Sequence, residues 1–299
     1  MELVGIKSIN LDDKPLFDSY FNEYNCMNSE YTFTNMFMWR KSYNIRYAII
    51  DGMLCIFSHH DGSPETVNFP LGNGDIKAVI EKLISYFGSI GQRPLIRIYC
   101  DREIDILNGL FPDRFILTED RNSFDYVYKV SDLIELPGSR YHSKRNHINQ
   151  FLAKYPYEYH RVTESHIPLC FEMFEKWCDG KEGMISGIAE QRQAVKFLID
   201  NFDYLGVTGG CITVDNELVA FSFGEVLSKK NSIAVIHLEH ADIDFQGSFP
   251  MINQQFLEHE WSSLTYVNRE EDMGIPGLRK AKKSYRPSIM VKKYIASLK

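Results

Sequence analysis

The order of predicted elements indicates an α+β protein built from two similar halves. Helical periodicity alternates with short apolar strands, and hairpin signals at Asp51-Gly52 and Asp215-Asn216 make the sheets mixed rather than purely parallel. Both halves follow the coarse order helix, hairpin, strand, helix, strand. The chain of 299 residues is long enough for two domains of roughly 140–150 residues each. We therefore expect two domains, each a mixed β-sheet flanked by helices.

The elements of the first half follow from periodicity and turn chemistry. Residues 12–24 carry apolar and aromatic side chains at helical spacing. Asp51-Gly52 separates two apolar runs and predicts a type I′ hairpin, because that turn needs positive φ at both central positions. Residues 75–87 are expected to form a second helix with an apolar inward face. Three further strands are expected within residues 94–100, 115–120 and 123–130.

The turn signal Leu136-Pro137-Gly138 predicts the domain boundary, which gives domains at 1–136 and 137–299. A long helix is expected from about residue 139 to residue 155, because apolar side chains recur there at helical spacing. The remaining elements alternate in the same manner. They are a strand at 157–162, helices at 166–178 and 189–202, a hairpin around Asp215-Asn216, a strand at 232–242, a helix at 249–262, a strand at 264–268 and a last helix at 274–285.

Composition and missing motifs exclude several classes of protein. A net charge of −7 argues against a general coat for nucleic acid, although it leaves room for a local basic patch. The six cysteines are scattered without a Cys-x-x-Cys pair, so zinc-ribbon, thioredoxin-like and disulfide-framework proteins are disfavoured. No dinucleotide, P-loop, serine-hydrolase or zincin motif is present. We expect buried or incidental thiols.

Location is predicted from apolar runs. The N-terminus lacks the apolar stretch of a secretory signal. No run approaches the ~18–20 apolar residues of a membrane span. A cytoplasmic protein without a membrane span is therefore expected.

The charge-rich stretch 265–285 is the first candidate site. Pro276 suits the first position of the last helix, because its missing N–H lacks an intrahelical partner there in any case. Lys282 falls in the apolar stripe of that helix, where a cation is costly unless it is paired or faces a cavity. Lys282 is either a snorkelling lysine or a cation aimed at a ligand's carboxylate or phosphate. Arg269 either pairs with the neighbouring acids or binds phosphate, and Glu270 is a candidate general base.

Three further groups of residues are candidates. Lys144 and Arg145 lie within the apolar face of their helix, and together with Lys282 they suggest a shared electropositive pocket. His237 and Glu239 share one face of a strand while His240 points the other way, so no metal site is expected. Gly247 and Ser248 form a possible anion-binding loop before a helix. For each group the alternative is an ordinary structural role.

Four segments resemble the phosphatidylglycerol lysyltransferase C-terminal domain family, a bacterial-type family, over nearly the whole chain. They are NSEYTFTNMFMW, SKRNHINQFLAKYPYEY, VIHLEHADIDFQGSFPMINQQF and YVNREEDMGIPGLRKAKKSYRPSIMVKKY. That family is similar to tandem acyltransferases of the acetyltransferase-like (GNAT) fold and to enzymes that move amino acids from aminoacyl-tRNA onto lipids or peptidoglycan. The resemblance implies two tandem GNAT-like domains, with the main motifs in the second.

The resemblance also implies an activity and roles for residues. The expected activity is acyl transfer, with an aminoacyl group moving from aminoacyl-tRNA to an amine or hydroxyl acceptor, lipid or small molecule. Glu239 and Glu270 are the expected proton acceptors, and Tyr285 is the expected donor. The expected substrate-binding residues are Lys144, Arg145, His237, Arg269, Arg279 and Lys282, and Arg279 rests on the resemblance alone.

Two alternatives to aminoacyl transfer stay open. One is an N-acetyltransferase that uses acetyl-CoA, which is disfavoured because no glycine-rich loop follows the strand that contains Glu239. The other is a binding module that keeps the fold without catalysis. Residues 269–299 hold nine Lys or Arg against three acids, a local basic patch suited to a tRNA acceptor stem. No cofactor is firmly implied.

Overall fold

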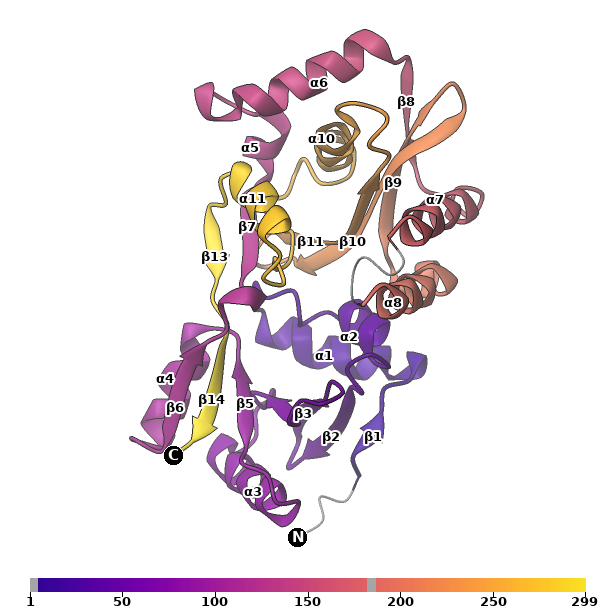
Figure 1. The fold of residues 1–299 in the computed structure, drawn as a ribbon. Coiled ribbons are helices and arrows are strands. Elements are labelled where there is room, and N and C mark those ends of the chain that lie inside the picture. The colour runs from indigo at the N-terminus through magenta and orange to yellow at the C-terminus, as the bar shows by residue number, and fades with distance from the viewer. Residues whose placement is uncertain (1–4, 182–186) are drawn as a thin grey trace. The chain divides into compact units, whose positions relative to one another are not determined.

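The structure is a computed structural model that describes residues 5–181 and 187–299 (Figure 1). The chain forms two compact units, here called the first and the second unit. The first unit contains Met1–Asp125, Glu271–Ile275 and Met290–Lys299, and the second contains Tyr126–Glu270 and Pro276–Ile289. The domain boundary expected at residue 136 stays a prediction, and the compact units are interleaved along the chain.

The sheet of the first unit has seven strands in the order β1-β2-β3-β4-β5-β14-β6. Their bounds are β1 Lys7–Ser8, β2 Arg46–Ile50, β3 Met53–Ser58, β4 Thr66–Asn68, β5 Leu95–Ile98, β6 Phe115–Glu119 and β14 Tyr294–Leu298. β4 and β5 run parallel, whereas β14 is antiparallel to both β5 and β6. The expected hairpin is confirmed, because Asp51 and Gly52 join β2 to β3 with φ of 48° and 77°. The sheet is mixed, as the hairpin predicted.

The described residues of the first unit form the α-helices α1 Lys14–Tyr24, α2 Phe33–Trp39, α3 Ile76–Ser89 and α4 Asp101–Leu110. Short 3-10 turns lie at Leu11–Asp13 and Arg121–Ser123. Asp75 begins α3 by accepting a hydrogen bond from the Ala78 amide at 3.0 Å. The apolar side of α3 is buried in one core with residues of the sheet, including Ala296 of β14. The helix predicted at 75–87 is confirmed.

The sheet of the second unit has the order β13-β7-β12-β11-β10-β9-β8. Its strands are β7 Asp125–Lys129, β8 Tyr157–Arg161, β9 Thr208–Val214, β10 Glu217–Ser228, β11 Ile233–Ala241, β12 Tyr266–Asn268 and β13 Ile289–Val291. β11 and β12 are parallel, and β10 pairs antiparallel with β9 and β11. Asp215 and Asn216, with φ of 51° and 67°, make the second predicted hairpin. This sheet is mixed too.

Helices cover both faces of the second sheet. They are α5 Val130–Glu135, α6 His142–Lys154, α7 Ile167–Asp179, α8 Ile188–Asp200, α9 Phe202–Leu205, α10 Ser248–Glu260 and α11 Pro276–Ser284, and a 3-10 turn at Ser139–Tyr141 precedes α6. Glu239 contacts Asn253 of α10, whereas the next residue, His240, contacts Phe174 of α7. Because neighbouring strand residues point to opposite faces, α10 and α7 lie on opposite sides of β11. Glu239 therefore lies on the face of the sheet that α10 covers.

No helix in the described ranges 5–181 and 187–299 is long and apolar enough to cross a membrane. The cytoplasmic location stays a prediction.

Candidate functional site

The candidate site lies where β11 and β12 carry polar side chains in the second unit. β12 ends at Asn268, but the next two residues still pair with Tyr126 of β7. The Arg269 amide donates to the Tyr126 carbonyl at 2.9 Å, and the Tyr126 amide donates to the Glu270 carbonyl at 3.2 Å. Glu270 has a positive φ of 55°, which is uncommon for a residue with a side chain. The backbone therefore holds Arg269 and Glu270 in place beyond the end of the strand.

Arg269 and Glu239 form a buried ion pair. Their nearest nitrogen and oxygen atoms are 2.7 Å apart, and the two side chains are only 14% and 10% exposed. Asn253 of α10 donates a hydrogen bond of 3.1 Å to the other carboxylate oxygen. A buried pair is tolerated only when its geometry is good and other hydrogen bonds satisfy the remaining polar atoms. Glu239 meets that requirement through Asn253.

Other polar atoms beside this pair are not satisfied. Nη1 of Arg269 is buried and has no hydrogen-bond partner among the described residues. The same holds, within that part of the chain, for Oδ1 of Asn253 and for the hydroxyl of Ser222, which lies opposite Glu239 in the β10–β11 ladder. Buried polar groups in folded proteins almost always have a partner in protein, water or ligand. These two acceptors and one donor around Glu239 are therefore the groups that would bind a water or a polar ligand here.

Lys144 and Tyr285 lie next to Arg269. The Lys144 ammonium is 3.9 Å from the centre of the Tyr285 ring, and the Arg269 guanidinium carbon is 4.9 Å from it. Burial, followed by the nearby Arg269 charge, lowers the pKa of Lys144 to about 8. Burial also raises the pKa of Tyr285 above its usual value, so its hydroxyl stays protonated at neutral pH. The site thus combines an easily deprotonated amine with a hydroxyl donor.

Lys282 supports the backbone of the site. Its ammonium donates a hydrogen bond to the backbone carbonyl of Arg269, and its own carbonyl accepts one from the Tyr128 hydroxyl at 2.8 Å. Lys282 therefore ties α11 to the residue that follows β12. Arg145 also binds backbone groups: its guanidinium donates hydrogen bonds to the carbonyls of Leu136 and Gly138. Of the two neighbouring cations on α6, only Lys144 lies beside Arg269.

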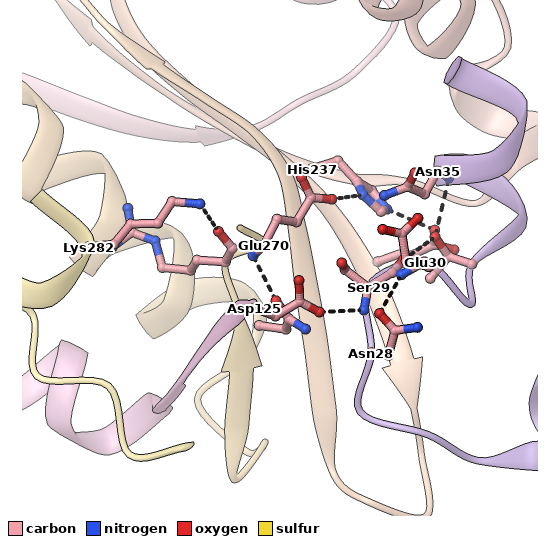
Figure 2. A network of polar contacts seen from close by, with 12 residues as sticks. Asn28, Ser29, Glu30, Asn35, Asp125, His237, Glu270 and Lys282 are labelled. Atoms are coloured by element: carbon pink, nitrogen blue, oxygen red, sulfur yellow. Dashed lines mark hydrogen bonds and ion pairs between the residues drawn. The ribbon is translucent and has the colours of Figure 1, made fainter. Parts of the chain in front are cut away.

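His237 is held between two carboxylates. Nδ1 lies 3.0 Å from Glu270 and Nε2 lies 2.9 Å from Glu225, and the histidine side chain is 1% exposed. Figure 2 shows the Glu270 carboxylate next to the His237 ring. Burial lowers the pKa of His237, but the hydrogen bonds to Glu225 and Glu270 outweigh it and raise the pKa to about 9. His237 is therefore an imidazolium that donates from both nitrogens, and Glu270 shares its carboxylate with it.

Gly247 and Ser248 have structural uses at the start of α10. Gly247 has φ of 95°, and a Cβ built there would lie 2.3 Å from the backbone carbonyl of His147 on α6. The Ser248 hydroxyl donates to the Asp242 carbonyl at 2.7 Å. The α6 backbone thus packs against this helix start, and the anion-binding role stays a prediction. Arg279 lies half-buried on α11, and its substrate-binding role also stays a prediction.

Three polar residues of the site, Ser222, Glu225 and Asn253, are not among those predicted from the sequence. A signal for Asn253 exists, because Phe249, Phe256 and Leu257 stand at i−4, i+3 and i+4 and share its helix face. A polar residue on a buried helix face needs a partner, and here the partner is Glu239. Glu225 had no comparable signal, because a β10–β11 register irregularity lies between it and the hairpin turn.

Two mixed sheets flanked by helices define the class of tandem GNAT-like proteins, which confirms the predicted fold class. A tandem GNAT protein from the clavulanic acid biosynthesis pathway matches 98% of this chain and 98% of its own, with a TM-score of 0.51 and 7% identity. At this level the likeness concerns the fold alone. Residues 21–297 match the family described as "Phosphatidylglycerol lysyltransferase, C-terminal", and the chain belongs to that family.

Three other proteins are similar to this chain. A conserved protein of unknown function from Bacteroides thetaiotaomicron VPI-5482 is 36% identical, with a TM-score of 0.92 over 99% of this chain and 100% of its own. The C-terminal domain of a putative lysylphosphatidylglycerol synthetase from Agrobacterium fabrum shares the fold at 13% identity, with a TM-score of 0.65 over 97% and 92% of the chains. An uncharacterized Mycoplasmoides gallisepticum protein is 24% identical over 59% of this chain, a match that spans 57% of that relative's length.

Proposed function

We propose that this protein is an acyltransferase that moves an aminoacyl group from aminoacyl-tRNA to an amine or hydroxyl acceptor. The observation that carries the proposal is the buried Arg269–Glu239 pair, beside which a donor on Arg269 and acceptors on Asn253 and Ser222 lack partners among the described residues. Family membership supports it, since the family's description is that of a lysyltransferase.

The chemistry of an aminoacyl ester fits these groups. Its ammonium is attracted by the Glu239 carboxylate and by the acceptor oxygens of Asn253 and Ser222. Its carbonyl oxygen gains negative charge when a nucleophile attacks, and the unused Arg269 N–H is suited to stabilise that charge. The ester bond to the tRNA ribose then breaks, and the ribose oxygen leaves with a proton. Orientation of the ester is the main contribution of this group of residues.

Lys144 and Tyr285 supply proton transfer in this proposal. Lys144, with a pKa of about 8, exists in part as a free amine near neutral pH and takes the proton of the attacking nucleophile. Tyr285 stays protonated and donates to the leaving ribose oxygen. Glu239 and Glu270, the expected proton acceptors, are engaged by Arg269 and His237. We assign them to charge and orientation.

No observation favours acetyl-CoA over this donor. A pyrophosphate is bound well by the free amides of a helix start. At the start of α10, Gly247 packs against the backbone of His147 in α6, so no space remains for an anion on that side of Gly247.

Binding to tRNA tests the proposal. We would measure the affinity of the purified protein for aminoacylated and deacylated tRNA at two salt concentrations, and the release of radiolabelled amino acid to phosphatidylglycerol vesicles and small amines. We expect tighter binding of the aminoacylated form and weaker binding at the higher salt. Equal affinity for both forms, together with no transfer from a fully aminoacylated tRNA pool, would overturn the proposal.

A further inference from the structure

The first unit contains a pair of thiols that the proposed reaction does not use. Cys26 lies in the segment between α1 and α2, and Cys100 is the residue immediately before α4. Cys26 and Cys100 lie close enough that each shifts the pKa of the other. The Tyr24 hydroxyl is 3.8 Å from the Cys100 sulfur. Residues 74 positions apart are thus brought together at one end of α4.

The surroundings distinguish the two sulfurs. The hydrogen bond from Cys26 and the amides of Glu103 and Arg102 outweigh burial and lower the pKa of the Cys100 thiol to about 6. The same hydrogen bond, followed by burial, raises the pKa of Cys26. The Cys100 thiol therefore loses its proton more readily than the Cys26 thiol. The amides at the start of a ten-residue helix favour the charge of the thiolate.

The other charged group beside the thiols is Glu103. It is fully buried and accepts hydrogen bonds from the hydroxyls of Tyr24 and Tyr31, at 2.8 Å and 3.1 Å, and from the Tyr99 amide at 2.6 Å. Burial, followed by the charge of Cys100, raises the pKa of Glu103 to about 8. A protonated Glu103 removes the like charge that would otherwise oppose a thiolate.

Accessibility separates this pair from the remaining cysteines. Cys26 and Cys100 are partly exposed, whereas Cys55, Cys170, Cys178 and Cys211 are buried. Burial also raises the pKa of Cys55 and Cys211 to about 12. Reactive cysteines need both thiolate character and access, and redox-active ones have a second thiol nearby to resolve the first oxidation product. Only the Cys26–Cys100 pair combines these features in the described part of the chain.

We propose that Cys26 and Cys100 form a dithiol that hydrogen peroxide oxidises to a disulfide, with Cys100 as the attacking sulfur. The Cys100 thiolate attacks one peroxide oxygen, the O–O bond breaks, and the departing hydroxide takes a proton to become water. The Cys26 sulfur then attacks the sulfenic acid, the S–S bond forms, and a second water leaves with the Cys26 proton. One peroxide is reduced to two waters as two thiols become one disulfide.

The new bond would act on a buried polar network within the same unit. Cys26 is three residues before Ser29, whose amide donates to the Asp125 carboxylate at 2.8 Å (Figure 2). Asp125 also pairs with Lys293 at 2.7 Å. A disulfide has an S–S length of about 2.05 Å, so the sulfurs must move closer than a hydrogen bond allows. The backbone between Cys26 and Ser29 is therefore the part of this network that the new bond would constrain.

Peptide mapping tests this proposal on the full chain. The reduced protein is treated with hydrogen peroxide, blocked with iodoacetamide and digested with trypsin. We expect loss of two of the six free thiols and a dithiothreitol-reversible link between the peptides 8–40 and 98–102. Cys26→Ser should leave a sulfenic acid on Cys100 that dimedone traps, whereas Cys100→Ser should give neither product.

The alkylation rate provides a second readout that does not need oxidation. At pH 7, iodoacetamide should modify Cys100 at least about tenfold faster than Cys55, because only the thiolate reacts. Circular dichroism of both serine variants checks that they fold. Modification of Cys100 no faster than Cys55, or oxidation that never links residues 26 and 100 in the folded protein, would overturn the proposal.

Discussion

The Arg269 guanidinium lies 2.7 Å from the Glu239 carboxylate, and this pair joins the end of β12 to β11 inside the second unit. Neither residue is close to the other in sequence, and Arg269 has three acids directly after it. Arg269 pairs with Glu239 instead of these acids. The carboxylate of Glu270, the first of them, contacts His237. The pairing of β11 with β12 thus brings the two residues together. The contribution of the pair to the free energy of unfolding can be measured.

Removing one partner of this pair should destabilise the fold. We expect Glu239→Ala to lower the free energy of unfolding by about 3 kcal/mol, because it leaves a buried guanidinium without its counter-charge. The matched control is Glu119→Ala, whose partner Lys292 and own side chain are both 52% exposed, and for which a loss below about 1 kcal/mol is expected. Urea unfolding measures both, and equal losses would contradict a role for burial.

Lys144 should set the pH dependence of transfer. Its pKa of about 8 predicts that the rate rises with pH up to that value, because the free amine is the proton acceptor. Lys144→Met should lower the rate by about 10²-fold and flatten the profile, as expected for loss of a general base. Lys154→Met, the same change at an exposed position at the end of α6, is the control. A pH profile unchanged by Lys144→Met would remove the assigned role.

The free energy of unfolding should fall at alkaline pH, because the His237 imidazolium loses its proton there. Its folded-state pKa of about 9 exceeds the ordinary 6.5, so its contribution is fully present below pH 6.5 and is lost as pH rises through 9. The contribution is at most about 3 kcal/mol, at 1.36 kcal/mol per unit of pKa. Unfolding of wild type and His237→Asn from pH 6 to 10 measures it. The difference in free energy of unfolding between the two proteins should become smaller as the pH rises. A difference that stays constant from pH 6 to 10 would contradict the prediction.

His240 should have the opposite effect in acid. Its ring lies 4.8 Å from the Trp177 ring and 5.1 Å from the Phe174 ring. Burial lowers its pKa from 6.5 to about 4. The unfolded chain therefore binds the proton first, and stability falls as pH drops from 6.5 to 4. In thermal unfolding, His240→Phe should show a smaller loss of stability than wild type between pH 6.5 and pH 4. An equal loss in both proteins would show that other groups cause the acid sensitivity.

Gly247 should tolerate no side chain. Gly247→Ala adds a Cβ only 2.3 Å from the His147 carbonyl oxygen, in addition to the backbone cost of positive φ, which is about 1–2 kcal/mol. Gly138→Ala isolates that backbone cost, because Gly138 has φ of 74° and no atom within 4 Å of a built Cβ. Thermal unfolding should therefore show a larger loss for Gly247→Ala. Equal losses of stability in Gly247→Ala and Gly138→Ala would mean that α6 shifts away from the added Cβ at little cost.

Local signals predicted much of the fold. Asp51-Gly52 and Asp215-Asn216 gave both hairpins, because their left-handed backbone is a property of the turn residues themselves. The position of β14 between β5 and β6 had no local signal, since strand order depends on contacts distant in sequence. The short helices α2 and α5 were missed too, because seven and six residues show too little periodicity.

The candidate site was predictable only as a set of residues. Strand alternation placed His237 and Glu239 on one face, and the stripe anomaly selected Lys144. Partners were not predictable: Asp272, next to Glu271, pairs with Arg121 at 3.2 Å. The carbonyls that Lys282 and Arg145 contact are backbone groups, to which side-chain patterns give no guide.

The position of β14 has a consequence for biosynthesis. Translation delivers residues 294–298 after every residue of the second unit, yet these residues pair with both β5 and β6. On the ribosome, β5 and β6 therefore stay without their shared neighbour until a strand about 200 residues later along the chain has been made. Pairings between such distant segments form slowly. The nascent first unit therefore cannot complete its sheet until residues 294–298 have emerged from the ribosome.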